Sequence, residues 1–125
     1  SLLAVAIAVL FLADVLDRAA GALPHGAQRK LDVALALATR PKLLLLDEPL
    51  AGMGPEDSLQ MVALIRRLRA ETAILLVEHD MDAVFRLADR ISVLDYGRLL
   101  TSGDAAWIRD HPEVRAAYLG AETAA

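Results

Sequence analysis

Two adjacent carboxylates, Asp47 and Glu48, follow a run of four leucines at residues 43–46 and precede Pro49. A continuous apolar run of this length is too short for a helix and is typical of a parallel strand covered on both faces. Pro49 has no N–H group to continue a strand ladder, so the carboxylates are expected at the carboxyl end of the strand. Ligands bind at that edge of open α/β sheets, where two acids could hold a cation and activate a water molecule. An ordinary acidic turn is the alternative interpretation.

A glycine-bearing turn and a helix come before these acids. Residues 21–26 contain two glycines together with Pro24 and His25, a composition typical of a turn. Apolar residues then recur at helical spacing, which predicts a helix over about residues 27–39. Pro41 ends this helix before the strand begins. The turn therefore leads directly into the amino end of a helix.

A histidine, His79, follows a second predicted strand. The apolar run at residues 73–77 closes a strand–helix–strand unit, which is expected to be parallel and right-handed. Glu78 and Asp80 flank the histidine. A metal site could be formed by His79 together with Glu78, Asp80 and Asp82. Alternatively, the acids could cap and solvate the following helix while His79 is a simple turn residue.

The remaining stretches complete an α/β domain with a mostly parallel sheet flanked by helices. They predict a buried helix within residues 2–20, helices near 55–69 and 81–88, and a helical tail over 104–119 that is interrupted near 111–112. They also predict a strand at 91–94, a turn at 96–97 and a strand that returns antiparallel at 98–102. The short connection at residues 96–97 places a hairpin at the edge of the sheet.

Length and composition exclude several classes of protein. The 125 residues suit one domain, and 56% hydrophobic with 24% charged residues predicts a folded chain. The net charge of −4, with 13 basic residues spread along the chain, argues against nucleic-acid binding. The absence of cysteine excludes a disulfide framework and is compatible with a reducing cytoplasm.

The uncharged run at residues 2–13 is shorter than the roughly 18–20 residues of a membrane span. The first residue is not methionine, which suggests that the sequence begins inside a longer protein.

In their order along the chain, these motifs resemble the ATP-binding subunit of ABC transporters. The residues Leu23, Pro24, His25, Gly26, Ala27 and Gln28 resemble the family's signature loop, residues 43–48 resemble Walker B, residues 51–54 the D-loop, and His79 the switch histidine. The resemblance continues through residues 77–81 and 87–91, so it covers nearly all of residues 20–119. Within the family, residues 51–53, 111–114 and 117–120 look most like importers of branched-chain amino acids.

The resemblance implies ATP and Mg²⁺ as cofactors and a role for each motif. Asp47 would hold Mg²⁺ through water, and Glu48 would polarise the attacking water as general base. His79 would contact the γ-phosphate. Residues 23–28 would present the amino end of the following helix to the γ-phosphate bound by an opposite subunit, which requires a dimer.

The sequence also departs from the family's pattern. A glycine-rich P-loop ending in Lys-Ser/Thr and a glutamine loop are both absent, so the chain resembles the carboxyl-terminal half of a nucleotide-binding domain. The expected organisation is the end of a helical subdomain at 1–22, the domain's carboxyl-terminal part at 23–121 and a disordered tail at 122–125. Pro24 stands where the family has serine, and Ala27 where it has glutamine. Without the phosphate cradle, the chain alone is expected not to hydrolyse ATP.

The function that the resemblance implies is the energising of import, with branched-chain amino acids as the expected cargo. The expected partners are membrane permease subunits and a second ATP-binding subunit, either identical or different. The expected location is the cytoplasm, peripheral on the inner face of the cell membrane. A degenerate subunit that docks on a partner ATPase is one alternative. An unrelated acid-tipped α/β domain is another, and His79 followed by the stretch 88–90 argues against it.

Overall fold

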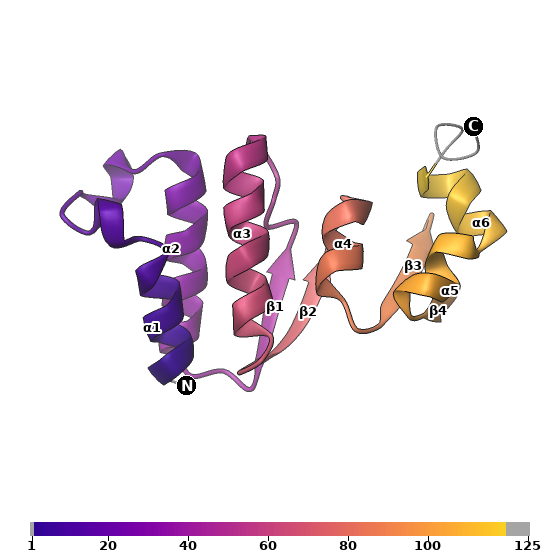
Figure 1. The fold of residues 1–125 in the computed structure, drawn as a ribbon, viewed down its shortest axis with the longest axis horizontal. Coiled ribbons are helices and arrows are strands. Elements are labelled where there is room, and N and C mark those ends of the chain that lie inside the picture. Colours follow the sequence, from indigo (N-terminus) through magenta and orange to yellow (C-terminus); the bar gives the residue numbers. More distant parts are fainter. Residues whose placement is uncertain (1, 120–125) are drawn as a thin grey trace. The chain divides into compact units, whose positions relative to one another are not determined.

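The structure, a computed structural model, describes residues 2–119 and divides between Glu78 and His79 into two compact units. The first unit contains α1 (Leu2–Leu10), α2 (His25–Ala38), β1 (Leu43–Asp47), α3 (Pro55–Leu68) and β2 (Ala73–Val77). The second contains α4 (Met81–Leu87), β3 (Ile91–Asp95), β4 (Arg98–Gly103), α5 (Ala105–Asp110) and α6 (Pro112–Val114) (Figure 1). Short 3-10 turns span Ala13–Val15 and Ala20–Ala22, and a π turn spans Arg115–Leu119. In residues 2–119 no helix combines the length and apolar character needed to cross a membrane.

β1 and β2 form a two-stranded parallel sheet, and α3 connects them (Figure 1). The register runs from Leu43 opposite Ala73 to Asp47 opposite Val77. α3 begins with a proline and two acids and ends with two arginines, an arrangement that suits its dipole. Its predicted apolar stripe is entirely buried and consists of Met61, Leu64, Ile65 and Leu68. The predicted parallel strand–helix–strand connection is confirmed.

The expectation that the strand at 43–46 is covered on both faces is wrong. Leu44 and Leu46 are 4% and 9% exposed, whereas Leu43 and Leu45 are 51% and 65% exposed. On β2, Leu75 is 58% exposed and Val77 54%. Alternating residues of a strand point to opposite faces, so helices cover one face of this sheet and leave an apolar face uncovered.

The buried helix predicted within residues 2–20 is shorter and less buried than expected. α1 ends at Leu10, and it buries only one face, through Ala4, Ile7 and Ala8. That face packs against α2 and α3, while Leu2 and Leu10 are 69% and 64% exposed. Neighbouring helices meet α1 on this face, and several of its other apolar side chains stay exposed. Beyond it, the charged residues of 14–18 interrupt the apolar stripe, so continued helix would have no face to pack.

α2 begins at His25, two residues before the predicted start at residue 27, so the predicted turn ends at Pro24. The carbonyl oxygen of Pro24 accepts a hydrogen bond from the N–H of Gln28 at 3.0 Å. Pro24 precedes the helix as its cap residue but offers no side-chain acceptor to the first free N–H groups. The helix prediction itself is confirmed, and only its amino end moves.

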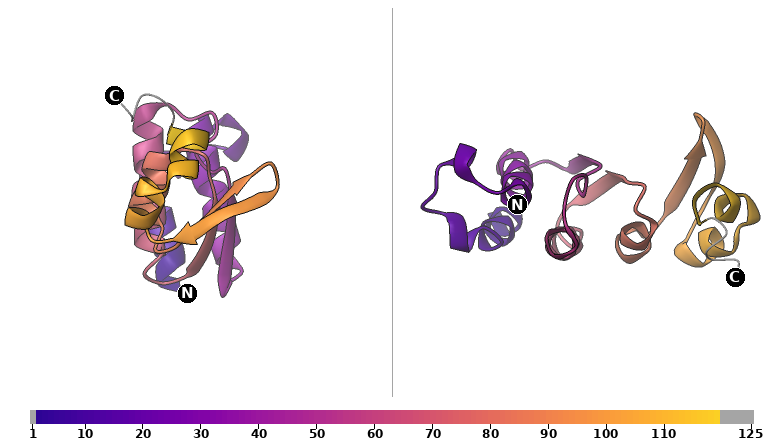
Figure 2. Two further views of the ribbon diagram at one scale, coloured as in Figure 1. Left: turned by 90° about the vertical axis from the view of Figure 1, so that its right-hand side faces the viewer. Right: turned by 90° about the horizontal axis from the view of Figure 1, so that it is seen from above.

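In the second unit, β3 and β4 form the predicted antiparallel hairpin, which Figure 2 shows as one extended ribbon. The hairpin is a two-stranded sheet of its own, so its predicted place at the edge of the parallel sheet stays a prediction. Tyr96 and Gly97 have φ angles of 49° and 76°, which is typical of a two-residue turn that matches strand twist. A bulge shifts the register between Val93 and Leu94, and the carbonyl oxygen of Leu94 accepts a hydrogen bond from the hydroxyl of Tyr118. The core of this unit is formed by Ile91, Val93, Ile108 and Val114.

The helical tail predicted over 104–119 is present and breaks at His111, before Pro112, as expected. The combination of helices, a parallel sheet and a hairpin confirms the predicted α/β class. The predicted boundary between residues 22 and 23 stays a prediction. The tail predicted to be disordered at 122–125 lies outside the described residues.

Candidate functional site

The carboxyl end of β1 carries the two acids, as the sequence predicted. Asp47 is the last residue of β1 and is exposed. Glu48 follows with a φ of 47°, in the left-handed region that non-glycine residues rarely adopt. Such a conformation costs on the order of 1–3 kcal/mol and persists only where the surroundings hold it. The strain therefore falls on the residue expected to act as general base.

Hydrogen bonds hold Glu48 on both sides of its α carbon. Its N–H donates to the carbonyl oxygen of Val77 at 2.8 Å, which extends the pairing of β1 with β2 by one bond. Its carbonyl oxygen accepts from the N–H of Ala51 at 3.1 Å, closing the turn that follows. The same oxygen accepts from Nη2 of Arg29 at 2.8 Å, in a half-buried position.

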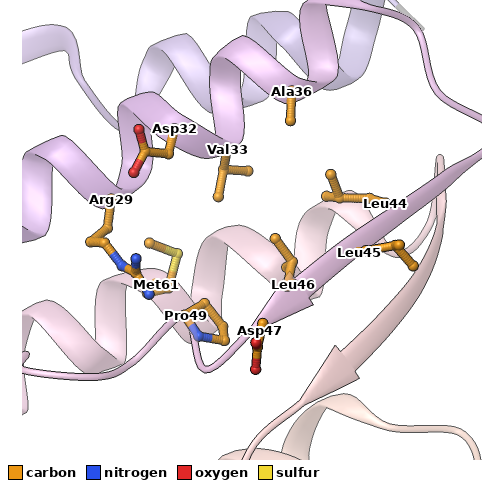
Figure 3. A pocket seen from close by; sticks show the side chains of 10 residues that line it. All are labelled: Arg29, Asp32, Val33, Ala36, Leu44, Leu45, Leu46, Asp47, Pro49 and Met61. Carbon is orange, nitrogen blue, oxygen red and sulfur yellow. The ribbon is translucent and has the colours of Figure 1, made fainter.

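Sequence reasoning missed the contact of Arg29. This residue lies on α2, directly after the loop at 23–28, and an arginine on the polar side of a helix is ordinary at the surface. Figure 3 shows its side chain extending from α2 toward Pro49. Neither residue type nor spacing marks such a long-range contact, so the sequence alone carries no signal for it.

The predicted signature loop at 23–28, whose last four residues form the first turn of α2, packs against the segments that follow the acids. Leu23 is buried, and its carbonyl oxygen accepts from the side-chain amide of Gln28 at 3.1 Å. Gly26 is also buried. A Cβ atom added at Gly26 would lie 2.6 Å from Cγ of Asp57, in the first turn of α3, so only glycine fits without movement.

His25 connects this loop to residues 50–54. Its Nε2 atom lies 3.0 Å from the carbonyl oxygen of Ala51, within hydrogen-bond distance. Gly52 has a φ of 74°, and a Cβ atom there would approach Nε2 of His25 to 3.3 Å. Pro24 is exposed and Ala27 is half-buried. Within the first unit, the fold thus brings the predicted signature loop and the predicted D-loop together.

A small hollow lies beside Asp47, between α2, α3 and β1 (Figure 3). It has a volume of about 170 Å³ and is lined by Arg29, Asp32, Val33, Ala36, Leu44, Leu45, Leu46, Asp47, Pro49 and Met61. Drug-sized ligands occupy pockets of roughly 300–1,000 Å³, so this hollow is too small for a nucleotide.

His79 begins the second unit, and its predicted role stays a prediction. In the same stretch, Oδ1 of Asp80 accepts a hydrogen bond from the N–H of Ala83 at 3.2 Å and caps α4. Within residues 2–119 no group of three or more histidines and acids could hold a metal ion. The hydrogen bond from Ala83 confirms the capping interpretation for Asp80.

Asp47 fits the way in which Mg²⁺ is usually held in nucleotide sites. This cation keeps several waters and takes one or two carboxylates, with substrate phosphates completing its shell. One exposed carboxylate at a strand end can supply such a contact without a dedicated protein cage. Metal binding by Asp47 remains a prediction that the chemistry of the side chain allows.

Comparison with known proteins supports the resemblance to the ATP-binding subunits of ABC transporters. Residues 3–51 match the family described as ABC transporter. A solved ATP-binding cassette of an ABC transporter, MJ1267 in its ADP conformation, superposes with a TM-score of 0.78 and 28% identity, covering 94% of this chain and 48% of that one. In fold and sequence, the chain is similar to the ATP-binding proteins of ABC transporters.

Its sequence is similar to proteins named as ATP-binding proteins of branched-chain amino-acid transport. The high-affinity branched-chain amino acid transport ATP-binding protein BraF of Pseudomonas aeruginosa is 44% identical over 111 residues, 87% of this chain and 44% of that protein. The corresponding protein LivG of Escherichia coli K12 is 43% identical over 106 residues, 83% of this chain and 42% of that protein. The chain thus spans less than half the length of these relatives.

Proposed function

We propose that this chain is the carboxyl-terminal portion of the ATP-hydrolysing subunit of an ABC importer, with branched-chain amino acids as the cargo. The observation that carries the proposal is the pair Asp47 and Glu48 at the carboxyl end of a parallel strand, with Glu48 held in a strained conformation. The relatives named for branched-chain amino-acid transport support the choice of cargo.

In the proposed site, Mg²⁺ would neutralise phosphate charge when bound. Asp47 is the residue of this chain that would hold it. Glu48 accepts the proton of the attacking water, and His79 contacts the γ-phosphate. The residues Leu23, Pro24, His25, Gly26, Ala27 and Gln28 form the loop that faces the nucleotide of a second subunit.

The chain alone is proposed to be inactive, because its sequence contains no phosphate-binding loop. The uncovered face of the β1–β2 sheet supports this proposal. Leu43, Leu45, Leu75 and Val77 are each more than half exposed, which is unusual for a sheet of a complete domain. The complete subunit is proposed to bind membrane permease subunits and a second ATP-binding subunit, at the cytoplasmic face of the cell membrane.

A chimera tests the function directly. In it, the matching segment of this chain replaces the 111-residue segment of BraF to which it is similar. We expect the chimera to hydrolyse Mg-ATP and the Glu48→Gln version to bind nucleotide but lose about 10²–10⁴-fold in turnover. Near-parental turnover by the Glu48→Gln chimera would remove Glu48 from the mechanism.

A non-hydrolytic subunit that docks on a partner ATPase is the second candidate, and Pro24 and Ala27 favour it. Pro24 precedes α2 without a hydroxyl or N–H group to donate to a phosphate. Restoring Pro24→Ser together with Ala27→Gln in the chimera separates the two candidates. For an active subunit we expect about a tenfold gain in turnover, or roughly 1.4 kcal/mol. An absence of hydrolysis both before and after the change would favour the docking candidate.

A further inference from the structure

Arg29 and Glu48 lie on different elements and meet through one short hydrogen bond. Nη2 of Arg29, in the first half of α2, donates to the carbonyl oxygen of Glu48 at 2.8 Å. The acceptor belongs to a non-glycine residue with a φ of 47°. A charged donor makes this bond stronger than one between neutral groups.

Two further hydrogen bonds of this backbone involve main-chain groups. The N–H of Glu48 reaches Val77, and its carbonyl oxygen accepts from Ala51. Arg29 is a side chain that holds this peptide group from another element. A non-glycine residue with a positive φ relaxes to a negative φ unless its surroundings prevent it.

We propose that Arg29 is a positioning residue that keeps Glu48 in its left-handed conformation and so directs the Glu48 carboxylate. The catalytic part of this inference rests on the proposed function, in which Glu48 is the base, whereas its conformational part does not.

The conformational part is tested by NMR on the full 125-residue chain. A residue with positive φ gives a strong intraresidue NOE between its amide and α protons, because these two protons lie close together. We expect a strong NOE for Glu48 in the parent chain and in the Arg67→Met control, since Arg67 is an exposed residue on α3. In Arg29→Met the NOE should weaken to the level of residues with negative φ.

Retention of the strong Glu48 NOE in folded Arg29→Met would overturn the inference. If Arg29→Met does not fold, Arg29→Gln is measured instead, because it keeps part of the stem while losing the charged donor. Arg29→Lys keeps the charge but presents a single donor group, so we expect it to restore part of the NOE. An equal loss in Arg29→Lys and Arg29→Met would show that the guanidinium geometry is required, which supports the inference.

The catalytic part is tested in the BraF chimera. We expect Arg29→Met to lower kcat about a hundredfold, the scale of a small misplacement of a catalytic group, with the KM for ATP within about twofold of the parent. An unchanged kcat in Arg29→Met would overturn the inference even if Glu48→Gln abolishes turnover. An active Glu48→Gln chimera would instead overturn the proposed function, while the NOE measurement would still decide whether Arg29 holds the backbone.

Discussion

The Nε2 atom of His25 lies 3.0 Å from the carbonyl oxygen of Ala51, which ties the first residue of α2 to the loop that follows the two acids. Gly52, next in that loop, packs so closely on the same ring that an added Cβ atom would lie 3.3 Å from Nε2. These contacts join segments separated by 26 residues in the sequence.

We predict that His25→Phe, which keeps a ring but removes the hydrogen bond, lowers the free energy of unfolding by about 0.5–1 kcal/mol. The contact is exposed, so a larger effect is not expected. Urea unfolding of the whole chain measures the change. His25→Asn, which keeps a polar side chain, should lower the free energy of unfolding by less than His25→Phe does. An identical loss in both variants would show that the hydrogen bond contributes nothing.

The effect of Gly26→Ala on the free energy of unfolding should change sign when the side chain of Asp57 is shortened. In the parent, a Cβ atom at residue 26 would lie 2.6 Å from Cγ of Asp57, and overpacking of this kind costs roughly 1–3 kcal/mol. In an Asp57→Ala background the obstruction is gone, and Gly26→Ala should stabilise by up to about 1 kcal/mol through helix propensity. Denaturant unfolding of the four chains measures both effects.

Gly21→Ala is the matched control for this pair, because a Cβ atom at Gly21 would meet nothing within 4 Å. We expect a change within about 0.5 kcal/mol. A destabilising Gly26→Ala in the Asp57→Ala background would contradict the steric explanation.

Glu48→Gly should raise the free energy of unfolding by about 1 kcal/mol, because glycine adopts a φ of 47° without strain. In the BraF chimera the same change should abolish ATP turnover. Arg40→Gly is the control, since Arg40 also has a positive φ, of 55°, and is exposed. It should stabilise to a similar degree without changing turnover. If neither variant gains stability, the left-handed conformations are not strained.

The two faces of β1 should respond in opposite ways. Leu44 is 4% exposed, so Leu44→Ala should cost about 2–5 kcal/mol of stability. Leu45 is 65% exposed, so Leu45→Gln should change the stability of the isolated chain by less than about 0.5 kcal/mol and reduce its self-association. Unfolding and sedimentation measure the two properties.

In the BraF chimera, where the rest of a domain is present, Leu45→Gln should become destabilising. A neutral effect there would mean that the uncovered face stays uncovered in the complete subunit, and the proposal of an incomplete domain would lose its structural support.

The chain alone should bind Mg-ATP only weakly, with a dissociation constant above about 1 mM. It lacks the loop that would hold the β- and γ-phosphates. Isothermal titration measures this. A dissociation constant in the low micromolar range would require about 8 kcal/mol of binding free energy from residues that have no assigned contact with the nucleotide. It would contradict the explanation by the missing phosphate-binding loop.

The sequence predicted the features that local pattern determines. The apolar runs identified β1 and β2, the buried stripe of α3 followed from its spacing, and Tyr96-Gly97 identified the hairpin turn. The coverage of β1 could not be predicted, because an apolar run indicates that burial is favourable without showing what provides it. The contact of Arg29 with Glu48 is a long-range tertiary contact, and no periodicity within one element reports it.

The start of α2 was misplaced for a different reason. Glycine and histidine at residues 25–26 are weak helix formers, so propensity places them in the turn. In the structure, His25 bonds to Ala51 and Gly26 packs against Asp57, and these tertiary contacts favour the helical conformation there. Tertiary packing overrode the local preference.

The hydroxyl of Tyr118 donates to the carbonyl oxygen of Leu94, next to the bulge in the hairpin. This bond links the last described turn of the chain to the strand that carries Ile91 and Val93, both in the core of the second unit. Amide protons of β3 and of the turn at 115–119 should therefore exchange with solvent in one cooperative opening rather than in two. The closing turn would then be as slow to exchange as the hairpin, although it lies near the end of the chain.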